Sequence, residues 1–216
     1  MSRPCCWRRM HKGGAVRYGT KAVLVCVAHG LTWPVTIPSI LGRRLLHSER
    51  GFDFSAKLLS LVPGRLGQYL RASFYMLTLD ECHYDLAVGF GSFFSHPTAR
   101  VGRGVGIGCF SIIGSAELAD GVMMGSRASV LSGKYHHGGG NRHPDVRANP
   151  LLLETVHIGE ATWIGEGALV MADVGAHCIV AAGCVVTKAV PDEATAVGNP
   201  ARCVYRSRAT TEAAAV

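Results

Sequence analysis

Aliphatic residues recur at every sixth position in the stretch 156–204, near the carboxyl end of the chain. One series is Ile158, Ile164 and Val170, and a second is Val174, Val180 and Val186. Small residues stand two positions before four of them, at Thr162, Ala168, Cys178 and Cys184. A period of six fits neither a helix nor a single strand. It fits a short strand and a tight corner, repeated three times per coil of a prism-shaped β-helix whose aliphatic side chains point inward.

The same rhythm begins earlier in the chain, at Val88. One register runs through Val101, Ile107 and Ile113, and a frame shifted by one residue runs through Leu118, Met124 and Val130. Residues 134–155 break the pattern, which resumes at Ile158. At about eighteen residues to a coil, we expect roughly five coils. A single excursion from a solenoid lies on one face and is often functional.

Short strands of a β-sandwich are the alternative interpretation of this pattern. Such strands would be separated by irregular spacings of about 8–12 residues, whereas the spacing here is an unbroken six. We therefore predict a mainly β fold: a parallel β-helix of hexapeptide repeats over residues 85–204. An α-helical, partly hydrophobic segment over 1–84 precedes it, and a short tail over 205–216 follows it.

Residues 21–41 carry one lysine, at the start, and no acidic residue. This apolar stretch is nearly as long as the ~20 residues that cross a bilayer. Pro34 and Pro38 interrupt it, and a straight central span rarely contains two prolines. Three interpretations stay open: a kinked or re-entrant membrane helix, an interfacial helix, or a helix packed on the protein itself. The first two give residues 21–45 a membrane surface as partner.

Residues 51–80 predict two amphipathic helices, separated at Val62, Pro63 and Gly64. Apolar side chains recur in the second helix at helical spacing, which predicts a core-facing stripe. Its members are Leu66, Tyr69, Leu70, Phe74 and Leu77. Arg65 and Arg71 lie outside this stripe, and one interpretation is that they face lipid headgroups.

Composition narrows the class of protein. Glycine is frequent at 27 of 216 residues and aromatic residues make up only 7%, as tight corners and small inward side chains require. The formal charge of +7 suits anionic partners. We expect no nucleic-acid partner, because no zinc finger, aromatic RNP motif or recognition helix occurs. The eight cysteines form no CxxC pair. They predict a reducing cytoplasm, with peripheral attachment to the inner face of the membrane as one option.

Three sequence blocks carry a family resemblance: WIGEGALVMADV, AAGCVVTKAVPD and GNPARCV. In that order and spacing they resemble the closing coils of the hexapeptide-repeat acyltransferases, a left-handed β-helix family, over residues 85–204. The segment SGKYHHGGG and the upstream LLSLVPGRLGQYLRASFYMLTLDEC are similar to the sugar O-acetyltransferases of polysaccharide gene clusters. The resemblance implies a homotrimer that moves an acetyl group from acetyl-CoA to a sugar hydroxyl in a polysaccharide or glycolipid precursor. The turn near Asp173 is shorter than the family's common form.

Acyl transfer to a sugar hydroxyl needs a base, and histidine has a suitable pKa. The resemblance of SGKYHH to the catalytic segment implies that His137 is this base. His143 is the first alternative, because Arg142-His143-Pro144 resembles the catalytic segment of maltose- and galactoside-type acetyltransferases. His136 is the second. Asp145 and Glu154 are the nearest carboxylates in sequence that could orient the base.

The resemblance also implies where acetyl-CoA binds, in a groove between neighbouring subunits along the later coils. The groove positions are Trp163, Ala182, Gly183, Thr187 and Lys188, and the closing loop is Asn199, Pro200, Ala201 and Arg202. Small residues would let the pantetheine arm approach the backbone, and the two basic residues would attract phosphates. No metal is expected.

Two other classes of function compete with this interpretation. A zinc lyase of the γ-carbonic-anhydrase type needs three converging histidines, and the spacing of His137, His157 and His177 does not resemble that ligand set. A catalytically silent scaffold is the second class. Among enzymes, an acetyltransferase for a small soluble sugar or xenobiotic is the alternative to one that acts on a polysaccharide or glycolipid.

Overall fold

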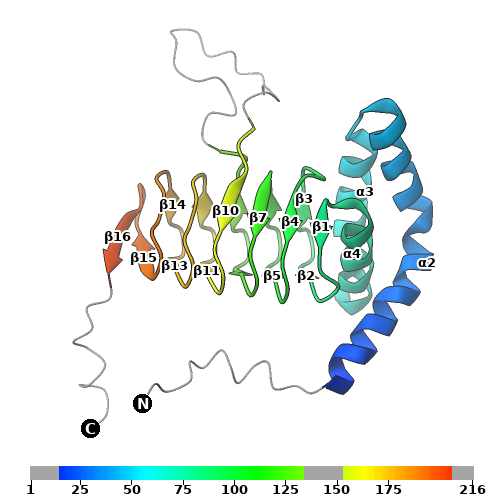
Figure 1. Ribbon diagram of the computed structural model, residues 1–216, viewed down its shortest axis with the longest axis horizontal. Helices are drawn as coiled ribbons and strands as arrows, with labels where there is room; N and C mark the ends of the chain where they lie inside the picture. The colour runs from blue at the N-terminus through cyan, green and yellow to red at the C-terminus, as the bar shows by residue number, and fades with distance from the viewer. Residues whose placement is uncertain (1–14, 134–152, 206–216) are drawn as a thin grey trace.

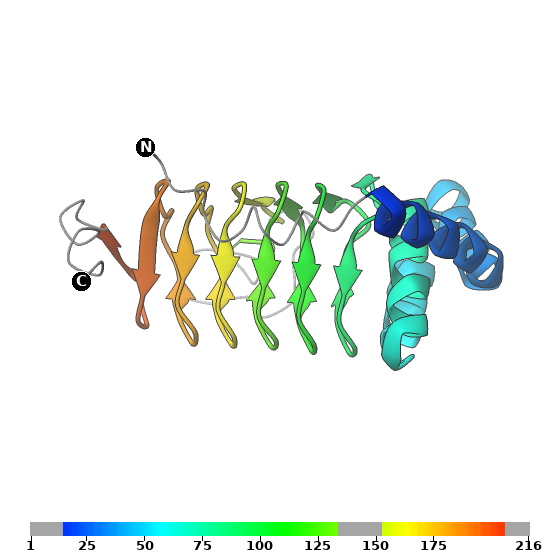
Figure 2. The same cartoon turned by 90° about the horizontal axis from the view of Figure 1, so that it is seen from below.

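The computed structural model describes residues 15–133 and 153–205, with side chains described for 27–133 and 153–204. Within these ranges the chain forms a parallel β-solenoid capped at its amino-terminal end by three helices (Figure 1). The coils stack along the long axis of the molecule, and the helices lie at one end of the stack (Figure 2). The predicted mainly β architecture is confirmed. The left-handed sense of the coil stays a prediction of the resemblance.

Three sheets form the faces of the prism. Sheet A contains β1 (Glu81–Cys82), β4 (Arg100–Val101), β7 (Ala116–Leu118) and β10 (Val156–Ile158). Sheet B contains β2 (Ala87–Val88), β5 (Gly106–Ile107), β8 (Met123–Met124), β11 (Trp163–Ile164), β13 (Ile179–Val180), β15 (Ala194–Val197) and the antiparallel β16 (Arg202–Tyr205). Sheet C contains β3 (Phe93–Phe94), β6 (Ile112–Ile113), β9 (Ser129–Val130), β12 (Leu169–Val170) and β14 (Val185–Val186). Sheet C has one strand for each of five complete coils, as the sequence predicts.

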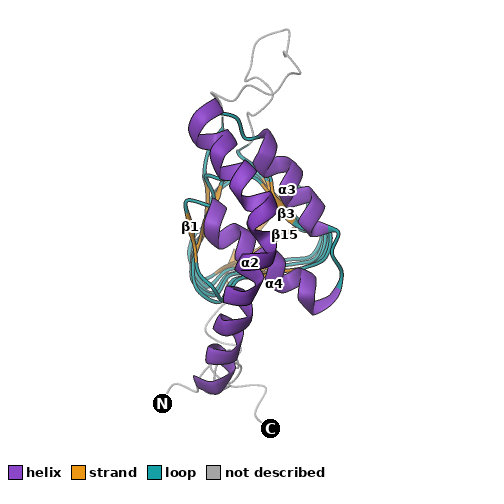
Figure 3. Ribbon diagram, turned by 90° about the vertical axis from the view of Figure 1, so that its right-hand side faces the viewer, coloured by secondary structure: helices purple, strands orange, loops and turns teal. Residues whose placement is uncertain are grey.

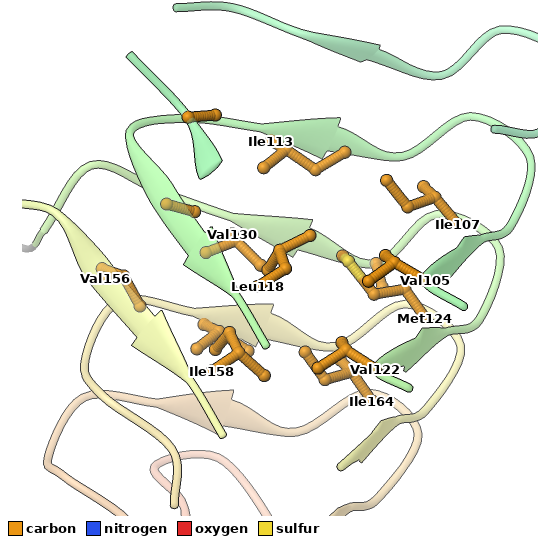
Figure 4. Close-up of a cluster of buried hydrophobic side chains, with 14 of the residues drawn as sticks. Val105, Ile107, Ile113, Leu118, Val122, Met124, Val130, Val156, Ile158 and Ile164 are labelled. Atoms are coloured by element: carbon orange, nitrogen blue, oxygen red, sulfur yellow. The ribbon is translucent and has the colours of Figure 1, made fainter. Parts of the chain in front are cut away.

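In every two-residue strand from β2 to β14, the second residue is buried and supplies the core. In β11, for example, Trp163 is exposed and Ile164 is fully buried. Figure 4 shows the inward side chains of successive coils packed on one another, among them Ile107, Leu118 and Ile158. The four small residues predicted beside them are buried as well: Thr162, Ala168, Cys178 and Cys184. The six-residue rhythm therefore describes the interior of the solenoid correctly.

Only one of the three corners changes length. Six residues separate the inward residues of sheets A and B, and six separate those of B and C, in every coil described. At the corner from sheet C to sheet A, here called the C–A corner, the step is seven residues from Phe94 to Val101 and five from Ile113 to Leu118. It is four from Val170 to Val174. The frame shift after Ile113 and the short turn near Asp173 are thus variations of the same corner.

Helices α3 (Arg50–Ser60) and α4 (Gly64–Thr78) pack on the first coil, through contacts with β3 and β2. They break near Pro63, as predicted. An aromatic cluster joins them to the solenoid: the Tyr75 and Phe94 ring centroids lie 4.9 Å apart in an edge-to-face pair, and those of Phe52 and Phe74 lie 5.6 Å apart. Of the predicted core stripe, Phe74 is fully buried but Leu66 is 59% exposed, because it lies in the first turn of α4, at its free end.

Helix α2 (Ala15–Leu46) is a single α-helix of 32 residues that contains both Pro34 and Pro38. It packs along α3 and α4 and forms the outermost layer of the helical end; Figure 3 views the molecule from that end, with α2 in front. The helix therefore packs on the protein itself, one of the three predicted arrangements. In the part of the chain that the structure describes, no helix has the length and hydropathy of a membrane span.

Arg71 does not face lipid headgroups, so its predicted role is wrong. Its side chain is 1% exposed and points between the helices and the first coil. Its Nη1 atom donates to the carbonyls of Leu59 and Val62 at 3.0 and 2.8 Å, and its Nε atom donates to the Val88 carbonyl at 3.1 Å. Burial lowers the pKa of the guanidinium. Arg65, six residues earlier in the helix, is exposed, so its predicted position at lipid headgroups stays a prediction.

Candidate functional site

The excursion leaves and re-enters the solenoid at the C–A corner, between β9 and β10. Both of its ends are hydrogen-bonded to the coils. The Ser115 N–H donates to the Ser132 hydroxyl at 2.8 Å, the Glu154 N–H donates to the Ser132 carbonyl at 3.2 Å, and the Ser115 and Thr155 hydroxyls lie 3.1 Å apart. The two ends of the excursion are therefore anchored to the coils by hydrogen bonds. No pattern in the sequence indicated that these serine and threonine residues would do so.

The three candidate catalytic histidines, His136, His137 and His143, lie outside the described residues, as does Asp145. Glu154 is described, and it stands at the base of the excursion. Its carboxylate lies over Gly133: a Cβ added to that glycine would be 2.6 Å from Glu154 Oε2. Gly133 also has a φ of +80°, which favours glycine. The choice among the histidines stays a prediction.

Four of the predicted acetyl-CoA positions flank strand β14 in the fifth coil. Ala182 and Gly183 form the corner before it, and Thr187 and Lys188 form the C–A corner after it. All are exposed except Thr187, which is half-buried. Gly183 has a φ of +67°, and an added Cβ would meet no atom of the described residues within 4 Å. The space above this corner is therefore open to a ligand.

The closing loop lies on the outer edge of the same strand. The Val185 N–H donates to the Gly198 carbonyl at 3.0 Å, and the Ala201 N–H donates to the Val185 carbonyl at 2.8 Å. The loop between them, with a cis Asn199–Pro200 peptide bond, extends sheet C beyond β14. Arg202 follows as the exposed first residue of β16. We call the seven residues around this strand the β14 group: Ala182, Gly183, Thr187, Lys188, Asn199, Pro200 and Arg202.

Trp163 does not lie with the β14 group. It stands on β11, one coil earlier, and its 47% exposed side chain faces outward from sheet B. Its register neighbours Met123 and Ile179 are also exposed, at 43% and 40%. Sheet B thus carries an outward apolar row, whereas β14 itself belongs to sheet C and only Arg202 of the β14 group lies on a strand of sheet B.

The electrostatics of the β14 group suit an anionic ligand. Lys188 and Arg202 are both exposed, one on each side of the strand. Small side chains at Ala182 and Gly183 leave the backbone between them accessible. Such a surface can hold phosphates by charge and an extended arm by backbone contacts. Each of these features lies on open surface, so a second surface is needed to enclose a bound molecule.

The described residues give no support to a zinc lyase. No group of three or more metal-binding side chains occurs among them. His157 on sheet A pairs with Glu117 at 3.3 Å, and the exposed His177 stands at a corner between sheets A and B. His137, the third histidine considered, lies outside the described residues.

Two other histidine–carboxylate pairs lie away from the predicted site. His96 Nδ1 is 2.9 Å from Glu49 Oε2, and His83 Nδ1 is 2.6 Å from Asp85 Oδ1. The first pair lines an open hollow of about 600 Å³ between the helices and the first C–A corner. Glu49 and His96 are 47 residues apart, so no sequence spacing reveals that pair. The second is two residues apart and could have been noticed.

Comparison with known proteins places the chain in a family. No family model matches it. It is 32% identical to a serine acetyltransferase of Escherichia coli (strain K12) over 121 residues, which is 50% of this chain and 37% of that one. It is 32% identical to a serine acetyltransferase of Synechococcus elongatus over 152 residues, which is 69% of this chain and 50% of that one. The chain therefore spans half or less of the length of these two relatives.

A solved structure supports the fold independently. The maltose O-acetyltransferase from Clostridium difficile 630 superposes with a TM-score of 0.59, covering 77% of this chain and 90% of that chain at 20% sequence identity. At this identity the match concerns the fold alone. Together with the six-residue coils and the sequence relatives, it leads to one conclusion: the chain belongs to the hexapeptide-repeat acyltransferase family.

Proposed function

We propose that this protein is an O-acetyltransferase that moves the acetyl group of acetyl-CoA to a hydroxyl of a sugar in a polysaccharide or glycolipid precursor. The observation that carries the proposal is the β14 group: an exposed corner with backbone accessible at Gly183, and the exposed cations Lys188 and Arg202 near the two ends of the strand. Acetyl transfer is also the activity in the names of its sequence relatives. The sugar acceptor rests on the resemblance of the excursion and of α4 to polysaccharide-cluster enzymes.

His137 acts as the general base in this mechanism. Its imidazole takes the proton from the acceptor hydroxyl while the hydroxyl oxygen attacks the thioester carbonyl. The tetrahedral intermediate collapses, the carbon–sulfur bond breaks, and the imidazolium returns the proton to the departing thiolate. The products are an acetyl ester and free coenzyme A. A positioned base of this kind contributes on the order of 10²–10⁴ in rate.

A homotrimer accounts for the separation of Trp163 from the β14 group. A groove between two packed prisms is lined by one face of the first subunit and a different face of the second. Trp163 on sheet B of one subunit would then meet the β14 group of its neighbour across that groove. The exposed apolar row of Met123, Trp163 and Ile179 provides surface for such packing.

Acetyl transfer to a small acceptor is the second candidate function. The sequence relatives are named serine acetyltransferases, which favours an amino-acid hydroxyl, and a soluble sugar or xenobiotic belongs to the same class. A scaffold without activity is the third. The three differ in what the purified chain acetylates.

The test is an acetyl-transfer assay with the full chain and acetyl-CoA, in which mass spectrometry detects the acetylated acceptor. Deacetylated polysaccharide, soluble monosaccharides and serine are offered in parallel. We expect transfer to the polysaccharide, and His137→Ala should lower kcat by about 10²–10⁴-fold. His157→Ala is the matched control, because this histidine is exposed on sheet A and should leave kcat unchanged.

Each other outcome has a definite meaning. A loss of activity in His143→Ala together with full activity in His137→Ala would move the base to His143. Faster transfer to serine than to any sugar would replace the proposed acceptor. If no acceptor is acetylated, the scaffold without activity would be the remaining candidate function.

A further inference from the structure

Helix α2 is amphipathic with the usual arrangement reversed. Apart from Arg44 near its end, its exposed side is apolar along the described length, from Val27 to Leu46. Six large apolar residues recur on it at intervals of two to four positions, and each is 44–70% exposed: Val27, Leu31, Trp33, Ile37, Leu41 and Leu45. We call these six residues the outer row of α2.

The buried side of the same helix is small and polar. Thr32, Thr36 and Ser39 are only 1–2% exposed, and with Ala28 they form the side that packs on the other two helices. A helix in water normally buries its apolar side and exposes its polar side. Here the hydroxyls are inside, and the leucines are outside.

Hydrogen bonds between hydroxyls hold α2 to its neighbours. The Thr32 and Ser73 hydroxyl oxygens lie 3.1 Å apart, linking α2 to α4, and the Ser39 hydroxyl donates to the Ser55 hydroxyl at 3.0 Å, linking α2 to α3. The backbones approach closely at Gly51, where an added Cβ would lie 3.2 Å from the Pro38 carbonyl oxygen. Small residues and hydroxyl contacts of this kind are typical of helix packing within a bilayer, where apolar side chains face lipid.

Neighbouring α3 extends the apolar surface. Phe54 and Leu58 lie on one side of that helix, four residues apart, and the C-cap residue Leu61 follows three residues later; all three are 46–67% exposed. The two helices lie side by side, joined through Ser39 and Ser55. Large apolar side chains exposed in such number on two helices that pack together mark an interaction surface.

The charge distribution indicates an anionic partner. Residues 1–80 contain twelve Lys and Arg and three Asp and Glu, a formal charge of +9. Residues 81–216 contain ten and twelve, a formal charge of −2. The positive charge of the chain is thus concentrated in its amino-terminal part, and the exposed Arg44, Arg50 and Arg65 belong to the three helices. An apolar surface with basic residues around it fits acidic lipid headgroups.

The two prolines fit a shallow position in the bilayer. Proline has no N–H, so the carbonyls of Gly30 and Pro34 lack the helical donor that a residue at 34 or 38 would otherwise supply. Both prolines are exposed on the same side as the outer row. Carbonyls without a donor are costly in hydrocarbon but are satisfied by water at the headgroup level.

We propose that the outer row of α2 and the exposed side of α3 form a docking surface for a bilayer that contains acidic lipids. The helical end of the molecule then rests on the membrane, and the coil stack projects away from it (Figures 1 and 3). This inference does not depend on the proposed acetyl transfer, because it concerns only where the protein binds.

The experiment is vesicle flotation with the purified full chain. Vesicles of phosphatidylcholine with about one third phosphatidylglycerol are compared with vesicles of phosphatidylcholine alone. We expect the chain to float with the acidic vesicles and to bind the neutral ones more weakly, with binding to the acidic vesicles reduced by added salt. Leu31→Glu and Leu41→Glu should each weaken binding about tenfold or more, because each leucine leaves water on docking.

Val204→Glu is the matched control, because Val204 is 53% exposed on β16, at the opposite end of the molecule. It should bind vesicles like the original chain, and circular dichroism should show that all three variants keep the fold. The proposal is overturned if the original chain binds neither type of vesicle, or if Leu31→Glu and Leu41→Glu bind as well as the control. It is also overturned if the outer row instead joins two copies of the chain. That result would be an oligomer that Leu31→Glu dissociates but that added vesicles leave intact.

Discussion

Arg71 offers the sharpest test of how the helices are joined to the solenoid. Its guanidinium is buried at the end of α3, beside the first strand of sheet B, and donates to four backbone carbonyls. Arg71→Met keeps much of the apolar stem and removes every donor. We expect this substitution to destabilise the contact between the helical cap and the first coil.

The size of the expected loss in stability depends on which carbonyls lose their hydrogen-bond donor. Those of Leu59 and Ser60 each retain a backbone donor, the N–H groups of Val62 at 3.2 Å and Gly91 at 2.8 Å. The loss therefore falls mainly on the carbonyls of Val62 and Val88. An unsatisfied buried acceptor costs about 1–3 kcal/mol. Removal of a buried cation recovers part of that sum. The expected net loss is about 2–3 kcal/mol, or roughly 5–10 °C in Tm for a chain of this size.

Thermal unfolding followed by circular dichroism measures the effect. Arg65→Met is the control, because Arg65 is exposed on the same helix, and it should change Tm by less than about 2 °C. Arg71→Lys should fall between the two, since a lysine cannot reproduce the planar fork that reaches several carbonyls. An Arg71→Met variant that melts with the original chain would show that these hydrogen bonds do not stabilise the cap.

Three further predictions concern backbone space, pH and thiols. Gly67→Ala should lower the free energy of unfolding by about 2 kcal/mol or more, because the new Cβ would lie 1.9 Å from the Val62 carbonyl oxygen. Gly30→Ala, with open space around it, should raise the free energy of unfolding by up to about 1 kcal/mol. Chemical denaturation measures both changes. The hydrogen bond from the Arg103 N–H lowers the pKa of Asp120. The ionised Asp120 carboxylate therefore stabilises the fold above its ordinary pKa of 3.8, and this stabilisation is lost as the pH falls below that value. The Tm difference between the original chain and Asp120→Asn should shrink on acidification from about pH 5 to about pH 3. Burial raises the pKa of the Cys178 thiol, so iodoacetamide at pH 8 should label the exposed Cys203 and spare Cys178, as peptide mass mapping will show.

The interior of the solenoid could be predicted from the sequence because each coil repeats one physical constraint. A side chain such as Ile164 must point inward at each sixth position, and that spacing is visible without any structure. The helix break near Pro63 was visible for a similar local reason. Corner lengths were visible only as irregularities, and the structure shows that they all belong to the C–A corner.

Arg71 could not be placed correctly, because the carbonyls around it come from two other segments of chain, residues 59–62 and Val88. A helical position with a basic side chain usually faces solvent, and only the carbonyls of Val62 and Val88 make burial favourable here. The same reason hides the Glu49–His96 pair. For the candidate site, most of the residues predicted from the sequence lie around β14 in the structure, and their role as an acetyl-CoA site stays a prediction. The sequence could not show that Trp163 faces outward from another sheet.

The variable C–A corner has a consequence for protein engineering. Each coil regains its register at the next inward residue, so extra residues at this corner leave the following strands in place. The step of four from Val170 to Val174 and the much longer excursion before Ile158 occur in the same stack of coils. A foreign peptide grafted between Met171 and Asp173 would be displayed on the same edge as the natural excursion. The scaffold thus offers an attachment point for a binding loop without a redesigned interior.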